Sequence, residues 1–107
     1  MTATDRLETE IDTGACYAPG DPVIVRLTHR DRRASVSDNG AAIKRAGSPP
    51  GWREVADRIG RELVVNVTRQ GVVWLPIVAV GPGEEAIVRR IGEASLAFHQ
   101  DLLELRS

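Results

Sequence analysis

The side chains of this chain that could perform chemistry lie close together in one region. His29, Asp31 and Asp38 are an imidazole and two carboxylates, groups that often act as general acids and bases. They predict a small hydrolase or nuclease in which His29 and Asp38 are catalytic. The alternative is structural: Asp38 precedes Asn39 and Gly40, and an aspartate there can accept hydrogen bonds from the first backbone N–H groups of a helix. We favour the structural role, and with it a protein that is not an enzyme.

Few side chains in the sequence could hold a metal or a cofactor. His29 and His99 are the only histidines and Cys16 is the only cysteine, too few for a zinc cluster within one chain. The stretch G-P-G-E-E-A at 81–86 matches the spacing of a dinucleotide-binding turn. Its Pro82 lacks an N–H, however, and its two glutamates would repel the phosphates at the start of the following helix. We therefore expect no metal and no cofactor.

A cluster of basic residues over 26–33 could bind a partner. Arg30, Arg32 and Arg33 are expected at the tip of a hairpin, where they could contact phosphate oxygens or an acidic protein surface. Trp52, beside a Pro-Pro-Gly turn, is a second candidate because tryptophan often anchors interfaces. The formal net charge is −1 and no aromatic residue is interleaved with the arginines. A protein partner is therefore favoured over nucleic acid, which stays an alternative.

The rest of the sequence describes the scaffold for these residues. With 107 residues the chain has the length of one domain, 1–107, built around a single core. Apolar residues make up 42% of it, as in globular proteins, and no apolar run approaches the roughly 20 residues of a membrane-spanning helix. The start, M-T-A-T-D-R-L-E-T-E, carries acids where a secretory signal would carry bases and an apolar stretch. We expect a cytoplasmic protein of bacterial type that makes no contact with a membrane.

The spacing of apolar residues predicts alternating hairpins and helices. Val23, Val25 and Leu27 recur with the period of a strand, whereas Trp52 and Ile59 fit one face of a helix. In chain order we expect a helix over 4–11, a hairpin over 23–36, a short helix over 41–46, an amphipathic helix over 52–63, a hairpin over 63–75 and a long helix over 84–105. Residues 1–22 then form an N-terminal helix and a loop with an extended piece over 15–18, and residues 23–105 form the core. Trp74 is expected inside, and Pro76 is expected at a sheet edge or at the end of the pairing because it has no N–H to donate.

The long helix over 84–105 carries more apolar residues than a small sheet needs to cover it. One face holds Ile87, Ile91, Ala94, Phe98, Leu102 and Leu105, and a second apolar edge holds Val88, Leu96 and Leu103. Such a wide apolar stripe predicts contact with something beyond the chain's own core. We expect a homodimer with Ile87, Ile91, Phe98 and Leu102 in its interface. The alternative is an accessory subunit whose helix packs on a different protein.

The turn Ser37-Asp38-Asn39-Gly40 also supports a comparison with a family. Together with the expected order of elements, it resembles small bacterial and phage domains of unknown function in which a β-hairpin runs into a T-D-D-G or S-D-x-G turn. The likeness covers about residues 23–105, and Asn39 replaces the second acid often found in that turn. The resemblance implies an α+β fold and brings no established activity with it.

These observations lead to an α+β fold and to three functional hypotheses. We expect two β-hairpins that form a small antiparallel sheet, packed against the amphipathic helix and the long C-terminal helix. The favoured hypothesis is a non-enzymatic interaction module that binds a protein partner and forms a homodimer. The alternatives are a small hydrolase or nuclease, or a nucleic-acid-binding protein that uses the basic hairpin tip.

Overall fold

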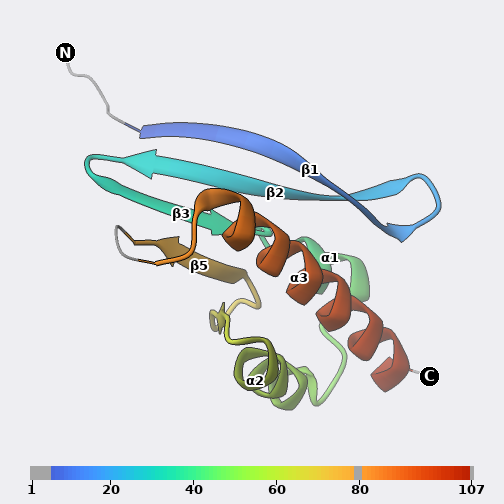
Figure 1. Ribbon diagram of the computed structural model, residues 1–107. Helices are drawn as coiled ribbons and strands as arrows, with labels where there is room; N and C mark the ends of the chain where they lie inside the picture. Colours follow the sequence, from blue (N-terminus) through green and yellow to red (C-terminus); the bar gives the residue numbers. More distant parts are fainter. Residues whose placement is uncertain (1–5, 79–80, 107) are drawn as a thin grey trace.

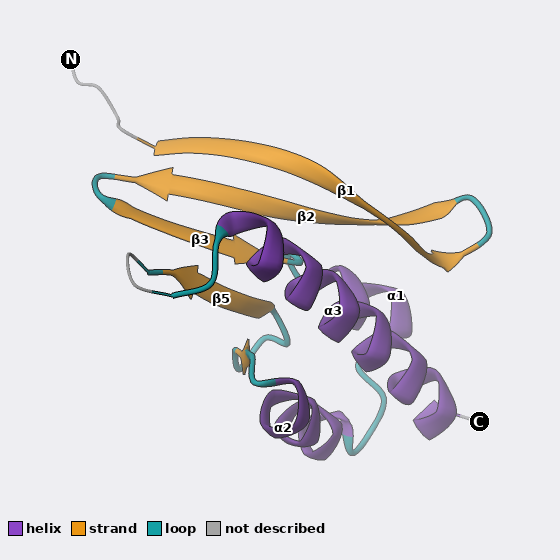
Figure 2. Cartoon of the chain, in the orientation of Figure 1, coloured by secondary structure: helices purple, strands orange, loops and turns teal. Residues whose placement is uncertain are grey.

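The structure is a computed structural model that describes residues 6–78 and 81–106. The strands are β1 (Arg6–Ala18), β2 (Asp21–Arg30), β3 (Arg33–Ser37), β4 (Asn66–Val67) and β5 (Val73–Ile77), and the helices are α1 (Ala41–Ala46), α2 (Trp52–Leu63) and α3 (Glu84–Arg106). The strands form one antiparallel sheet in the order β1-β2-β3-β5-β4 (Figure 1). Helix α3 lies across one face of the sheet, and α1 and α2 pack against α3 (Figure 2). The predicted α+β fold class is confirmed.

The N-terminal region is a strand and not the predicted helix. The helix expected over 4–11 is wrong for the described residues 6–11, which belong to β1 and pair with β2. Leu7 and Ile11 fit the spacing of a helix, but Leu7, Thr9 and Ile11 also alternate as a strand does. Pairing with the long strand β2 satisfies the backbone of this segment and so decides between the two periods. The extended piece predicted over 15–18 is confirmed as the end of β1, so this region belongs to the sheet.

The first hairpin and its tip are confirmed. β2 and β3 pair from Arg26 opposite Ser37 to Arg30 opposite Arg33. Asp31 lies in the turn with a positive φ of 56°, a conformation that aspartate tolerates better than most residues. The hairpin therefore places its arginines where the sequence predicts them.

The short helix α1 is confirmed, although Asp38 does not cap it. Its N-cap is Gly40, with a φ of 74° and no hydrogen bond from a capping side chain. Its C-cap is Gly47, whose N–H donates to the carbonyl oxygen of Ile43, as expected of a glycine that ends a helix. The carboxylate of Asp38 accepts from the N–H of Gly40 itself and, in addition, from distant parts of the chain.

Helix α2 is confirmed, and the second hairpin is shorter than expected. Leu63 still belongs to α2, and β4 consists of Asn66–Val67, which pair with Trp74 and Val73 of β5. β4 ends before it reaches the level of Pro76, which lies opposite Ser35 of β3. The edge position predicted for Pro76 is therefore confirmed on this side of β5.

The core lies between the sheet and α3. The sheet contributes Val23, Val25, Leu27, Val36 and Val73, and α3 contributes Ile87, Ile91, Ala94, Phe98 and Leu102, all buried. Because side chains alternate along a strand, Trp74 next to buried Val73 points to the opposite face, where it is half-buried. The prediction that Trp74 lies inside is wrong. In the described ranges, no helix is both long and apolar enough to cross a membrane.

Candidate functional site

The two predicted catalytic residues do not form a site. His29 is exposed near the end of β2, and Asp38, beyond the end of β3, is 1% exposed. His29 lies opposite Ala34, and the chain from Ala34 to Asp38 spans about 13 Å at roughly 3.3 Å per residue. Asp31, the third candidate, is exposed in the β2–β3 turn. The chemistry expected of His29 with Asp38 therefore has no common location in this structure.

Asp38 is instead the centre of a buried hydrogen-bond network. Its Oδ1 accepts from the N–H of Gly40 at 2.9 Å and of Val73 at 3.0 Å, and its Oδ2 accepts from the hydroxyl of Ser95 at 2.6 Å. Burial raises the pKa of the Asp38 carboxyl, and the hydrogen bond from Ser95 is the largest effect that opposes the rise. The network ties the β3–α1 turn to β5 and to α3.

The network continues to the end of β1. The hydroxyl oxygens of Tyr17 and Ser95 are 2.7 Å apart, and burial raises the pKa of the Tyr17 phenol. The guanidinium of Arg45 lies 4.5 Å from the centre of the Tyr17 ring and also binds Asp21 through two hydrogen bonds. Asp38, Ser95 and Tyr17 are all buried, so their hydrogen bonds stabilise the fold. Asp38 and Tyr17 also line a small pocket of about 210 Å³ together with Arg45.

The structure places no metal site among the described residues. Across 6–78 and 81–106, no group of three or more His, Cys, Asp or Glu side chains is arranged to hold an ion. Cys16 is exposed on β1.

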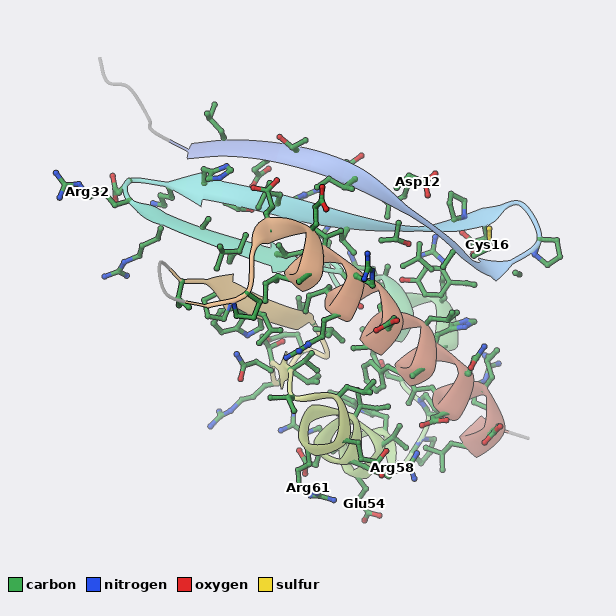
Figure 3. All side chains as sticks on the ribbon, in the orientation of Figure 1. Asp12, Cys16, Arg32, Glu54, Arg58 and Arg61 are labelled. Carbon is green, nitrogen blue, oxygen red and sulfur yellow. The ribbon has the colours of Figure 1, made fainter. Side chains whose placement is uncertain are left out.

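The predicted binding residues fall into two separate places. Arg30, Arg32 and Arg33 are exposed at the β2–β3 turn, and Figure 3 shows Arg32 extending from the end of this hairpin. Trp52 begins α2, where the guanidinium of Arg53 lies 5.1 Å from its ring centre. The aromatic residue beside the arginines is Trp74, which lines the same surface groove as they do. Sequence reasoning missed this pairing.

The four residues expected in a dimer interface belong to the protein's own core. Ile87 is 5% exposed, and Ile91, Phe98 and Leu102 are 0% exposed. They therefore have almost no surface to bury against a second copy, and this assignment has to be corrected. The exposed apolar side chains at the end of α3 are Leu103 and Leu105. The homodimer itself stays a prediction that would need another surface.

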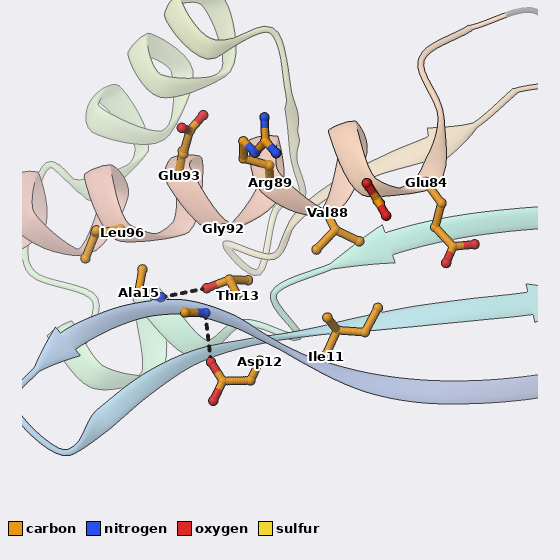
Figure 4. A pocket seen from close by; sticks show the side chains of 12 residues that line it. Ile11, Asp12, Thr13, Ala15, Glu84, Val88, Arg89, Gly92, Glu93 and Leu96 are labelled. Atoms are coloured by element: carbon orange, nitrogen blue, oxygen red, sulfur yellow. Dashed lines mark hydrogen bonds between the residues drawn. The ribbon is translucent and has the colours of Figure 1, made fainter.

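A groove lies between β1 and α3 (Figure 4). It has a volume of about 530 Å³, and its apolar residues are Ile11 and Ala15 from β1 and Val88 and Leu96 from α3. The two elements meet at Gly92, where an added Cβ would lie 2.9 Å from Cγ2 of Thr13. The glycine therefore sets how closely the helix approaches the strand.

The rim of this groove is acidic. Asp12, Glu84, Glu85 and Glu93 line it together with a single base, Arg89, which gives the lining a formal charge of −3. Figure 4 shows that Asp12 also supports the local backbone, because its Oδ1 accepts from the N–H of Gly14 at 2.9 Å. Gly14 has a φ of 86° and lies where the pairing of β1 with β2 shifts register. A basic ligand would complement this lining.

Strand β1 borders the groove and is an edge of the sheet. It pairs with β2 on one side only, since it stands first in the strand order. Every second residue of its regular part therefore directs its backbone N–H and C=O groups away from the sheet. Sequence reasoning missed this edge because it read 4–11 as a helix, although the alternation of Leu7, Thr9 and Ile11 was a signal for a strand.

Comparison with known proteins finds no matching family model, no similar curated protein and no similar solved structure. The resemblance based on Ser37-Asp38-Asn39-Gly40 therefore stays a prediction.

Proposed function

We propose that this protein is a non-enzymatic interaction module that binds an extended segment of a partner protein along β1, in the groove between β1 and α3. The observation that supports the proposal most strongly is the open edge of β1 beside a groove with an apolar floor. An extended peptide can add to such an edge through main-chain hydrogen bonds, while alternate side chains enter the groove. Protection of long open edges is usual in proteins, by lysine, proline or a covering element.

The edge of β1 carries little of this protection. Between Arg6 and Ala18 the sequence has no lysine and no proline, and its irregular pairing begins only after Asp12. Leu7, on the regular part, is 68% exposed. Its acids, Glu8, Glu10 and Asp12, discourage pairing with a strand of like charge, so this stretch is suited to pair with a strand of opposite charge.

The charge pattern of β1 favours a basic partner over a second copy. Glu8, Glu10 and Asp12 share the face of the sheet that points away from α3, because alternate residues of a strand share a face. Antiparallel self-pairing within this stretch would place these acids opposite one another, which is destabilising. A partner strand with basic residues on this face would match the acids of β1, and the apolar residues on its other face would lie towards the apolar side chains of the groove.

A pair of peptides tests the proposal. An eight-residue peptide of alternating Val and Arg should bind and should slow hydrogen exchange at alternate amides of β1, whereas an alternating Val and Glu peptide should not. Glu10→Lys, on the face that the peptide's arginines share, should weaken binding up to about fivefold, as for an exposed ion pair of about 1 kcal/mol or less. The matched control is Glu54→Lys on the exposed side of α2, which should leave the affinity unchanged.

Two results would count against the proposal. Equal binding of both peptides, or protection of amides outside β1 and α3, would show that the groove does not select an extended basic segment. Light scattering at tens of micromolar identifies the occupant. A monomer that binds the peptide supports a separate partner, and a dimer that the peptide dissociates would place a second copy along β1.

A further inference from the structure

The face of the sheet opposite α3 carries a second surface with its own chemistry. Arg26, Ser37 and Trp74 lie side by side across β2, β3 and β5, and Thr28, Ser35 and Pro76 form the next row. Their neighbours along the strands, such as Leu27 and Val36, are buried beneath α3. These polar residues and Trp74 therefore share the face that α3 leaves uncovered.

The hairpin end of this face has an excess of positive charge. Its groove is lined by Arg30, Arg32 and Arg33 against one acid, Asp31, a formal charge of +2. None of these three arginines forms an ion pair with a described residue, whereas Arg45 binds Asp21 at 2.7 Å. Like charges held together without a partner favour an anionic ligand.

Trp74 and the hydroxyl groups of the same groove indicate which anion fits. Trp74, Thr28 and Ser35 line it together with the arginines, so an aromatic ring, hydrogen-bonding hydroxyls and guanidinium groups share one open surface. Trp74 lies opposite Ser37, which is about 13 Å along β3 from Arg33 at roughly 3.3 Å per residue. An inorganic phosphate would reach the arginines alone, whereas a polymer of linked phosphates and bases spans the distance.

We propose that this face binds single-stranded nucleic acid, with phosphates at Arg30, Arg32 and Arg33 and a base stacked on Trp74. Unpaired bases are free to stack on an aromatic ring, and arginine beside such a ring is the usual combination in proteins that bind single strands. In a duplex the bases are already stacked on each other, so Trp74 would have no role. This surface lies on the other side of the sheet from the β1–α3 groove, and the inference does not depend on the function proposed for that groove.

The test uses Trp74 as its own reporter. The two tryptophans are Trp52 and Trp74, so Trp52→Phe leaves Trp74 as the sole source of tryptophan fluorescence. Titration of this variant with a ten-nucleotide oligothymidylate should quench the emission. With three phosphates neutralised, the dissociation constant should rise about 20-fold between 50 and 200 mM salt, because each contact on a single strand contributes about 0.7 to the logarithmic slope.

Substitutions separate the two parts of the site, with affinity read from the anisotropy of a labelled oligonucleotide. Changing any of Arg30, Arg32 or Arg33 to Gln should reduce the salt slope by about 0.7. Trp74→Leu should weaken binding about tenfold with an unchanged slope, because it removes stacking but no charge. Arg61→Gln on α2, where Figure 3 shows the residue away from the hairpin, is the charge-matched control and should change neither quantity. Circular dichroism checks that each variant is folded.

Several outcomes would overturn the inference. The first is that the oligonucleotide does not bind at 50 mM salt. The second is that the fluorescence of Trp74 stays constant when the oligonucleotide is saturating. The third is that Arg61→Gln reduces the affinity as much as Arg32→Gln does. Duplex DNA that binds as tightly as the single strand, or an oligoglutamate that competes equally well, would also overturn it. Either result would assign the arginines to a different anionic partner.

Discussion

Replacement of Asp38 by Ala measures whether this residue is a helix cap or the centre of a buried network. A simple N-cap contributes about 1 kcal/mol. In the structure Asp38 accepts from two backbone N–H groups, of Gly40 and Val73, and from the Ser95 hydroxyl. Each buried donor left without an acceptor costs about 1–3 kcal/mol, and removal of a desolvated carboxylate offsets part of this. We expect a net loss of about 3 kcal/mol in the free energy of unfolding.

Urea unfolding followed by circular dichroism provides the measurement. With a denaturant slope of about 1–3 kcal/mol per molar for a small domain, Asp38→Ala should lower the midpoint by roughly 1–3 M. Asp57→Ala on the exposed side of α2 is the control and should change stability by less than about 0.5 kcal/mol. A loss near 1 kcal/mol for Asp38→Ala would refute the network as the source of its effect.

The pH dependence of the same residue has a definite sign. In the Asp38→Asn variant, the side-chain oxygen can still accept hydrogen bonds from the N–H groups of Gly40 and Val73. The amide side chain, however, cannot ionise. Burial raises the pKa of Asp38 in the folded protein above its ordinary value of 3.8, so between these two values the folded state binds more protons than the unfolded state. The stability of the natural protein relative to Asp38→Asn should therefore be greatest in acid, fall as the pH rises through the folded pKa and then level off. A difference that stays constant with pH would contradict this reasoning.

Two other positions give predictions of defined direction. Burial lowers the pKa of His99, and its Nδ1 has no hydrogen-bond partner in the described ranges. The protein should therefore lose stability as the pH falls from the ordinary histidine pKa of about 6.5 through the lower pKa of His99 in the folded state. His99→Phe should show a smaller loss between pH 7 and pH 5 in urea unfolding, and an equal loss would contradict the assignment. Gly92→Ala should lower the free energy of unfolding by about 1 kcal/mol. Overpacking against Thr13 costs about 1–3 kcal/mol, which exceeds the gain of about 1 kcal/mol from the higher helix propensity of alanine. Thr13→Ser removes the methyl group that an alanine at position 92 would contact too closely. The double variant Thr13→Ser/Gly92→Ala should therefore regain part of the lost urea midpoint. If it is no more stable than Gly92→Ala alone, Thr13 is not the source of the steric clash.

Only one of the two candidate sites could be read in part from the sequence. The arginines of the β2–β3 turn were predicted because a hairpin tip is a local feature, set by alternation on either side of a turn. Their aromatic neighbour was misassigned, because the side to which Trp74 points depends on the register of β5 against β3. The groove was not foreseen, because its walls come from β1 and α3, at opposite ends of the chain.

The sequence by itself determined the elements whose period is unambiguous. Helices α2 and α3 and the β2–β3 hairpin follow from apolar residues spaced at 3.6 or 2 residues, and such patterns are complete within each segment. The tertiary structure decided where two periods competed or where partners were distant. Residues 6–11 form a strand because they can pair with β2. The Asp38 carboxylate accepts hydrogen bonds from the Val73 N–H and the Ser95 hydroxyl, which lie 35 and 57 residues further along the chain. Contacts of this kind depend on which segments the core brings together, and local periodicity carries no information about that choice.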